Sequence, residues 1–221
     1  MKKIRDILHK YRHAWLLSYA FIYLPWFCYL ERTVTRDYHI MHASLDDLIP
    51  FNEYFIIPYF LWFVYVAGTL VFFLFHSKED YYKMCTFLFS GMTLSLIICT
   101  FFHNGTDFRP VIDPDKNIFS AAVAALYKTD TCTNVFPSIH VYNSVGTHIA
   151  ISRSPLFAKH RILRLCSFLL TVSICLATMF LKQHSIIDVF GAFLMAYVIH
   201  YFVYGYAADT EDKKITEKAL G

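Results

Sequence analysis

His184 and Asp188 form the most chemically suggestive pattern in the sequence. They stand four positions apart at the start of an apolar stretch, so on a helix they share one face, one turn apart. A carboxylate placed in this way fixes the tautomer of the imidazole and leaves the other ring nitrogen free as a nucleophile or base. An aspartate inside an apolar segment is costly unless it is paired. The spacing therefore predicts a preorganised pair, with a purely structural hydrogen bond as the alternative.

A second candidate lies at the start of another apolar stretch. Residues 136–140 read Phe-Pro-Ser-Ile-His, so a proline stands where a helix would begin, followed by the hydroxyl of Ser138 and the imidazole of His140. Proline suits the first position of a helix, and the N–H groups of that first turn can bind an anion. The segment therefore predicts an anion site. A lone histidine here is more often a packing or interfacial residue.

The elements that must position these residues belong in a membrane. The chain has 221 residues, of which 57% are apolar and 17% are charged, and its mean hydropathy is +0.42. This composition is too apolar for an ordinary soluble domain. The net charge of +3 is too small to indicate a nucleic-acid partner. We therefore expect an all-α polytopic membrane protein that binds no nucleic acid.

Six stretches are expected to span the membrane as one helical bundle. The fourth is short and polar, which indicates a helix buried among the others. Short interfacial helices are expected in the outer loops, over Asn117–Tyr127 and within residues 38–50. The six expected spans are residues 14–30, 54–75, 84–102, 138–152, 162–181 and 185–206.

The domain plan that follows is simple. We expect an N-terminal tail (1–13), a single membrane domain (14–206) and a C-terminal tail (207–221), since no repeat or composition break marks a second domain. A cleavable signal peptide is not expected, because residues 14–30 lack a small-residue cleavage site. Most of the six cysteines fall in or beside spans, so a disulfide framework is not expected either.

Basic residues predict the orientation of the bundle. If six spans alternate, most lysines and arginines fall on the side of the two termini, which the positive-inside rule makes cytoplasmic. The candidate site then lies on the extracytoplasmic, or lumenal, face of a multi-pass membrane protein. The basic residues on the cytoplasmic side are Lys2, Lys3, Arg5, Lys10, Arg12, Lys78, Lys83, Arg153, Lys159, Arg161, Arg164, Lys213, Lys214 and Lys218.

Three short motifs occur in a recognisable order. Arg109-Pro110 is followed by the Pro-Ser-Ile-His segment at 137–140, and then by His184 with Asp188 four residues later. This order and spacing, together with the six-span plan, resembles the type 2 phosphatidic acid phosphatase superfamily over roughly residues 50 to 205.

The resemblance implies a role for each matching residue. His184 is implied as the nucleophile that forms a phosphohistidine, Asp188 as the carboxylate that orients it, and His140 as the acid and base that serves the leaving and accepting oxygens. Arg109 and Ser138 are implied as substrate phosphate ligands. The resemblance implies no metal and no cofactor.

Two departures from the family pattern remove cations. Phe102 stands where the first motif has a lysine, and Ala177 and Thr178 stand where the third motif has Ser-Arg. Ile139 also replaces the usual glycine of the middle motif. The trimmed pattern resembles the sphingomyelin-synthase-like and inositol-phosphoceramide-synthase-like branch of the superfamily.

Several functions remain open on these residues. The first is a lipid phosphatase acting on phosphatidate or an isoprenyl phosphate, and the second is a phosphotransferase that moves the head group of a phospholipid or sphingolipid. A diester brings one negative charge where a monoester brings about two, so few cationic ligands suit the diester. A transporter with an ion or proton pathway is the non-enzymatic alternative. A metal site built from His140, His184 and Asp188 is a further one.

Lys182 is expected to replace one of the missing cations. It lies two residues before His184, and its flexible stem can bring an ammonium group to a substrate phosphate. The alternative is a lysine that extends from the end of a span to the interface. The sequence indicates neither the lipid nor the oligomeric state.

The orientation makes a testable prediction about residues 103–137. In a cysteine-free background, Lys116→Cys should react with a membrane-impermeant thiol reagent added to the extracytoplasmic side, because the basic residues place that loop there. Reaction from the cytoplasmic side alone would overturn the topology and the location of the site.

Overall fold

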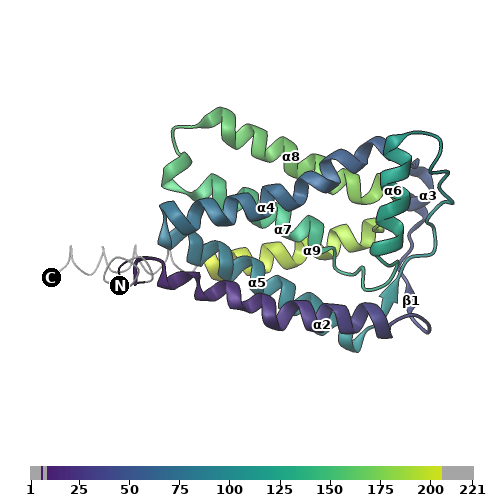
Figure 1. Cartoon of the computed structure of the whole chain (residues 1–221), viewed down its shortest axis with the longest axis horizontal. Coiled ribbons are helices and arrows are strands. Elements are labelled where there is room, and N and C mark those ends of the chain that lie inside the picture. Colours follow the sequence, from purple (N-terminus) through teal and green to yellow (C-terminus); the bar gives the residue numbers. More distant parts are fainter. Residues whose placement is uncertain (1–5, 7–8, 206–221) are drawn as a thin grey trace.

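The computed structural model describes residue 6 and residues 9–205 as an elongated bundle of helices that run along its long axis (Figure 1). The helices of the bundle are α2 (Ala20–Thr33), α4 (Ile56–His76), α5 (Lys78–Phe101), α7 (Ile139–Arg153), α8 (Arg161–Phe180) and α9 (Ile186–His200). A 3-10 segment, Arg12–Tyr19, leads directly into helix α2, and a π-helical segment, Tyr201–Gly205, follows helix α9.

Every stretch expected to span therefore contains helix, but the six-span count is not confirmed. Within the described residues, four helical segments are long and apolar enough to cross a membrane, whereas α2 has 14 residues and α7 has 15. The C-terminal tail and most of the N-terminal tail, with six of the basic residues cited above, lie outside the described residues. The four segments are Glu53–His76, Lys78–Phe101, Arg161–Phe180 and Ile186–Gly205.

Side-chain caps define where several helices begin. Ser77 accepts the N–H of Asp80 at the start of α5, and Glu79 and Asp80 place negative charge in its first turn, where the helix dipole favours it. Asn117 caps α6 (Ile118–Thr129) through the N–H of Ser120. This helix confirms the one predicted over Asn117–Tyr127.

The outward faces of the bundle are apolar. Phe21, Val64, Ile162 and Phe190 each expose more than 60% of their surface. Apolar exposure on this scale, on several helices, would be an aggregation liability in water and is what a helix in lipid requires.

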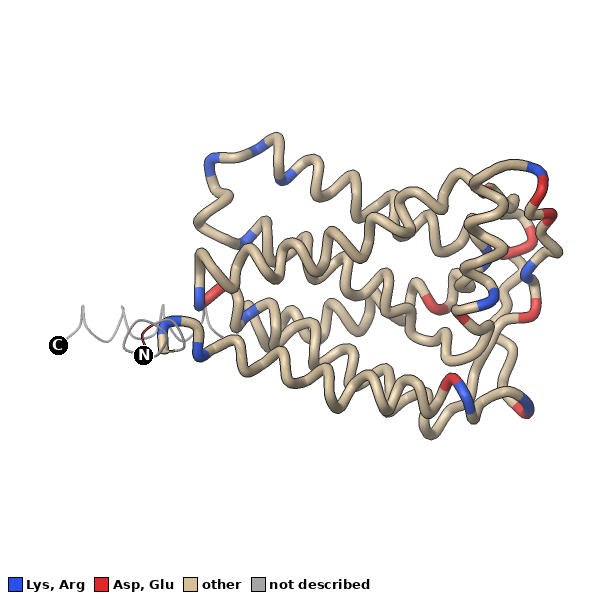
Figure 2. The backbone as a smooth tube through the Cα atoms, in the orientation of Figure 1, with Lys and Arg blue, Asp and Glu red and all other residues tan. Residues whose placement is uncertain are grey.

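The two ends of the bundle differ in charge, as Figure 2 shows. The end near the N-terminus collects the connections 76–78 and 153–161, with many basic residues and few acidic ones. The opposite end collects residues 34–55, 102–138 and 181–185 and mixes both signs. The loops thus alternate between the ends as expected, while the cytoplasmic assignment remains a prediction.

A small cap closes the end that mixes both signs. Strand β1 (His39–Ile40) pairs in parallel with β2 (Asn104–Gly105), and the short helix α3 (Ser44–Leu48) follows β1. Lys116 and Glu53 form an ion pair of 2.6 Å that ties the long loop to the start of α4. These two-residue strands are an addition to the all-α expectation.

Helix α7 lies inside the bundle and packs against α4, α5, α8 and α9. Two glycines allow this close approach. A Cβ at Gly91 would lie 2.1 Å from the ring of Tyr142, and one at Gly146 would lie 2.4 Å from the ring of Phe87. The rings of Phe87 and Tyr142 stack with centroids 4.9 Å apart, so the helices that meet here have no spare space.

Gly91→Ala should therefore destabilise the protein by about 1–3 kcal/mol, the usual cost of overpacking. The ring of Tyr142 cannot move aside easily, because it is fully buried and its hydroxyl donates to the carbonyl of Phe87 at 2.6 Å. Gly68→Ala is the matched control, since nothing lies within 4 Å of its added Cβ. Thermal unfolding in one detergent should separate the two variants, and equal midpoints would contradict the packing argument.

Candidate active site

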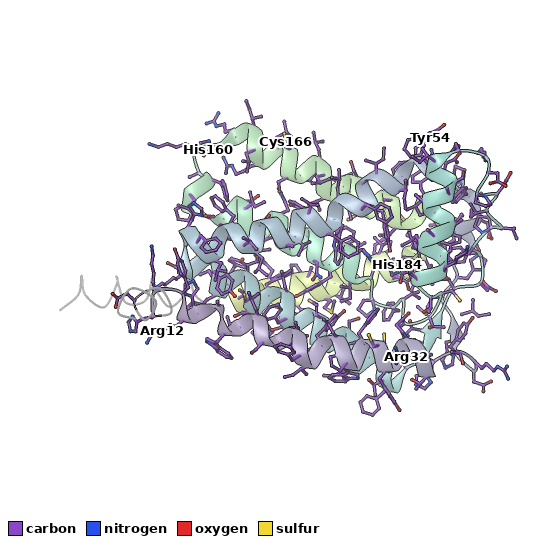
Figure 3. All side chains as sticks on the ribbon, in the orientation of Figure 1. Arg12, Arg32, Tyr54, His160, Cys166 and His184 are labelled. Carbon is purple, nitrogen blue, oxygen red and sulfur yellow. The ribbon has the colours of Figure 1, made fainter. Side chains whose placement is uncertain are left out.

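His184 sits in a tight turn between α8 and α9. The carbonyl of Thr178 accepts the N–H groups of Gln183 at 2.9 Å and of His184 at 3.1 Å. Lys182 adopts a left-handed conformation with φ of 53° to make this turn. The turn directs His184 into the interior of the bundle, near the end where Arg32 and Tyr54 lie and far from Arg12 and His160 (Figure 3).

The predicted His184–Asp188 contact is present but loose. Nδ1 of His184 lies 3.4 Å from Oδ2 of Asp188, which is longer than an ordinary hydrogen bond. The same oxygen accepts the N–H of Ser185 at 2.9 Å, so Asp188 also completes the capping box of α9. Catalytic hydrogen bonds are often long in sites without ligand. With Nδ1 turned toward the carboxylate, Nε2 is the nitrogen left for chemistry.

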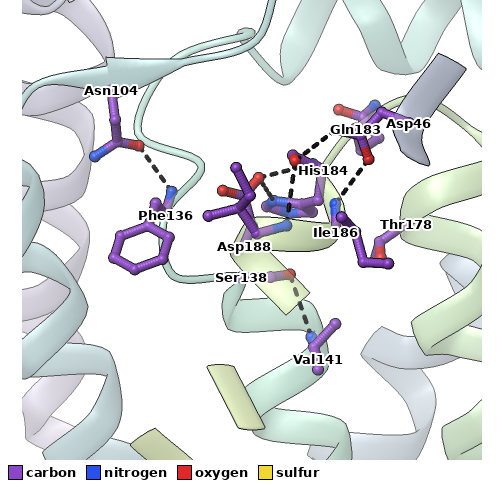
Figure 4. A network of polar contacts seen from close by, with 12 residues as sticks. Asp46, Asn104, Phe136, Ser138, Val141, Thr178, Gln183, His184, Ile186 and Asp188 are labelled. Atoms are coloured by element: carbon purple, nitrogen blue, oxygen red, sulfur yellow. Dashed lines mark hydrogen bonds and ion pairs between the residues drawn. The ribbon is translucent and has the colours of Figure 1, made fainter. Parts of the chain in front are cut away.

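A second buried aspartate, Asp46, holds the same helix start (Figure 4). Its carboxylate accepts the hydroxyl of Ser185 at 2.6 Å, the N–H of Ile186 at 2.9 Å and the N–H of Ala43 at 2.8 Å. The first N–H groups of α9 are therefore satisfied by the protein itself. Asp46 thus takes the place that an external anion would otherwise occupy in front of this helix start.

Lys182 is directed away from the histidines. Its ammonium donates to the carbonyl of Asp46 at 2.7 Å and to that of Ile49, and it lies 5.6 Å from the ring centre of Phe108. The structure thus gives it carbonyl partners in the outer cap in place of the substrate phosphate expected from sequence. The physical reason is the left-handed turn at Lys182, which points its side chain toward the α3 segment.

His140 lies in the first turn of α7, against two aromatic rings of α4. Its ring centre is 4.6 Å from that of Tyr59, 4.5 Å from that of Trp62 and 5.7 Å from that of His184. The structure therefore brings the two histidines together from segments that are 44 residues apart in the sequence. At this distance the two rings are near neighbours, and both line the cavity described below.

Ser138 has a structural role in this geometry. Its side chain is fully buried and accepts the N–H of Val141 at 3.4 Å, which makes it the N-cap of α7. Its own N–H donates to the carbonyl of Asp188 at 3.2 Å. Ser138 thereby links the start of α7 to the start of α9, and it is not among the residues that line the cavity described below.

Asn104 is an organising residue that was not predicted from the sequence. It is fully buried, and its Oδ1 accepts the N–H of Phe136 at 2.7 Å while its carbonyl accepts the N–H of Asn134 at the same distance (Figure 4). These bonds fix the segment that leads to His140. The Asn-Gly dipeptide at 104–105 was the available signal, since it is a typical turn pair.

Arg109 reaches the site through the backbone of the loop that follows α6. Its guanidinium donates to the carbonyls of Asp130 and Thr131, each at 2.7 Å, and to Oε1 of Gln183. It also lies 4.8 Å from the ring centre of Tyr127. Burial raises the pKa of Tyr127 to about 12, so its hydroxyl stays protonated and donates to the carbonyl of Leu181.

One cavity of about 400 Å³ brings most of these groups together. His140, His184 and Arg109 all line it, whereas Lys182, Ser138 and Asp188 do not. The other lining residues are Tyr23, Leu24, Phe27, Glu31, Tyr59, Trp62, Phe63, Leu126, Thr129, Asp130, Thr131, Thr133, Asn134, Val135, Ile139 and Gln183. Such a volume and mixed lining suit the head group of a small ligand.

Metal binding was the other chemistry open to these residues. Among residues 6 and 9–205, no three His, Cys, Asp or Glu side chains form a group that could hold a metal ion. His140, His184 and Asp188 accordingly do not form one.

A helical bundle with apolar outward faces and a cavity of mixed lining near one end defines an integral membrane protein with an internal site. The chain matches the PAP2 superfamily over residues 80–211, more than half of its length, and it belongs to that superfamily. The resemblance drawn from the three motifs is thus confirmed. No curated protein and no solved structure matches the chain. Superfamily members are generally phosphoric ester hydrolases or phosphotransferases, so a function of this type is supported here.

Asp46 and its neighbour Asp47 provide a matched test of the site's scaffold. Asp46→Asn should lower stability by about 1.5–3 kcal/mol, because it weakens hydrogen bonds to a buried charged group. Asp47→Asn should cost less than about 1 kcal/mol, since Asp47 is exposed and its ion pair with His42, at 2.9 Å, lies at the surface. Thermal unfolding in detergent measures both. Equal effects would show that Asp46 does not support α9.

Proposed function

We propose that the protein transfers phosphorus from a membrane lipid phosphate ester through a covalent intermediate on His184. The observation that carries the proposal is the shared cavity, which places His140, His184 and Arg109 around one volume. The matched superfamily supports chemistry of this class.

Each residue then has a defined task. Nε2 of His184 attacks phosphorus, the bond to the leaving oxygen breaks, and His140 gives that oxygen a proton. An acceptor hydroxyl next gives its proton to His140 and attacks phosphorus, which releases His184. Asp188 positions the ring and stabilises its positive charge, as the aspartate of a catalytic triad does. Arg109 binds the phosphoryl oxygens.

The acceptor defines two forms of this activity. With water, the protein is a lipid phosphatase, the first hypothesis from sequence. With a lipid hydroxyl, it is a head-group phosphotransferase, which the sphingomyelin-synthase-like resemblance favours. In the described part of the chain, Arg109 is the one lysine or arginine that lines the cavity, and a single cation suits a diester better than a doubly charged monoester.

The proposal predicts distinct effects for the two histidines. His184→Ala should abolish a phosphoenzyme formed from a lipid labelled at phosphorus, because the nucleophile is gone. His140→Ala should still allow labelling but lower turnover by about 10²–10⁴-fold, the range for loss of a general acid or base. Labelling by gel autoradiography and product release measure the two effects.

The same assays separate the alternatives. Release of free phosphate from phosphatidate or an isoprenyl phosphate supports the phosphatase, and a product lipid with a transferred head group supports the transferase. Activity that survives His184→Ala but disappears with a chelator would contradict the proposal and favour metal chemistry.

A further inference from the structure

The cavity contains two carboxylates that the proposed phosphorus chemistry does not use. Glu31 of α2 accepts the hydroxyl of Thr131 and the amide of Asn134 at 2.8 Å, and Asp130 accepts the hydroxyl of Tyr59 at 2.9 Å. Within the described residues, neither carboxylate forms an ion pair with a lysine, arginine or histidine side chain. Arg109 contacts the backbone carbonyl of Asp130, not its carboxylate. The cavity therefore presents two carboxylates whose side-chain partners, among the described residues, are the neutral donors Tyr59, Thr131 and Asn134.

Aromatic rings share the walls of the cavity with these carboxylates. Tyr23 and Phe27 come from α2, and Tyr59, Trp62 and Phe63 come from α4. The faces of such rings attract ammonium groups, most strongly where water is excluded. Rings together with carboxylates make a site for an organic cation.

A buried amide next to Arg109 supplies a group that suits an anion in the same cavity. Gln183 is 2% exposed, lines the cavity, and has no hydrogen-bond partner for Nε2 among the described residues. Its orientation is fixed, because the guanidinium of Arg109 only donates and must face Oε1. The free N–H₂ group is thus a donor beside Arg109 and His184, suited to a phosphoryl oxygen.

We infer that the cavity binds a phosphodiester lipid whose head group carries an ammonium cation. Arg109 and Gln183 hold the phosphoryl oxygens, and Glu31, Asp130 and the rings of Tyr59 and Trp62 hold the ammonium group. This inference rests on the proposed function and names the substrate class for it. A phosphomonoester without a cation would bring about two negative charges to a cavity that already has two carboxylates.

The remaining wall suits the lipid part of such a substrate. Leu24 lies seven residues before Glu31 on α2, which is roughly 10 Å deeper at 1.5 Å per residue. Phe27 and Phe63 also line this part, so the wall becomes apolar away from the charged end. Glu31, Tyr59 and Trp62 all precede residue 80, outside the region that matches the superfamily. The selectivity for the head group therefore comes largely from the part of the chain that lies before that region.

The test compares four lipids with the same acyl chains in maltoside micelles. Phosphatidylcholine and phosphatidylethanolamine carry an ammonium group, phosphatidylglycerol is a diester without one, and phosphatidate is a monoester. In each of the four lipids the reaction breaks the bond between phosphorus and the diacylglycerol oxygen, and that oxygen takes a proton from His140. Release of diacylglycerol therefore measures the turnover of all four lipids. We expect phosphatidylcholine and phosphatidylethanolamine to react about tenfold faster than phosphatidylglycerol. The faster of these two ammonium lipids shows whether the site prefers a quaternary or a primary ammonium group.

Variants assign this preference to the carboxylates. Glu31→Gln, alone and with Asp130→Asn, should reduce the ratio of ammonium-lipid turnover to phosphatidylglycerol turnover to within about twofold, since only the cation loses a partner. Asp47→Asn, at the same end of the molecule but outside the cavity, should keep the full preference. A preference that survives the double variant would overturn the assignment.

Failure of the inference and failure of the proposed function give different results. Diacylglycerol release through His184 with equal or faster use of phosphatidylglycerol or phosphatidate keeps the function and overturns the head-group inference. Diacylglycerol release from none of the lipids contradicts the proposed function. In that case a ligand-binding measurement still tests the head-group inference by itself. Quenching of Trp62 fluorescence reports ligand binding, and phosphocholine should bind about tenfold more tightly than glycerol 3-phosphate. Trp62→Phe should remove the quenching signal. Equal affinity for the two ligands would overturn the inference.

Discussion

The site depends on the pairing of two buried carboxylates with the start of α9. Asp188 and Asp46 sit in an interior where an unpaired charge would cost several kcal/mol. Both accept hydrogen bonds from the same short segment, Asp188 from the N–H of Ser185, and Asp46 from the hydroxyl of Ser185 and the N–H of Ile186. The positive end of the helix dipole adds to this. His184 precedes that segment directly, so its position follows from the charge pairing.

The position of His140 relative to His184 is fixed through the backbone. Ser138 caps α7 and donates its N–H to the carbonyl of Asp188, which joins the starts of the two helices that carry the histidines. Close packing at Gly91 and Gly146 holds α7 in the centre of the bundle. Neither helix can shift along its axis without breaking this contact or opening the core, and rigid placement of this kind is what a preorganised site requires.

Much of the helical fold could be predicted from sequence, because a membrane helix satisfies its own backbone and is chosen mainly by apolar length. The same rule explains the weaker cases. Helix α7 is short and polar because protein, not lipid, surrounds it, and α2 is preceded by a 3-10 segment that hydropathy does not distinguish. The pairing of His39 with Asn104 was beyond prediction, since two-residue strands 65 residues apart in the sequence carry no periodic signal.

The sequence by itself determined the residue spacings and the helix caps, which are local along a helix. The spacing of His184 and Asp188, and the caps at Asn117 and Ser185, follow from helix geometry within a few residues. Only the tertiary structure decided which distant groups meet them. It brought Asp46 to a serine 139 positions away, turned Lys182 toward backbone carbonyls, and placed Glu31 in the cavity that both histidines line. The physical reason is that a buried charge selects its partners from whatever the packed helices bring within about 3 Å, and one-dimensional spacing does not encode that distance.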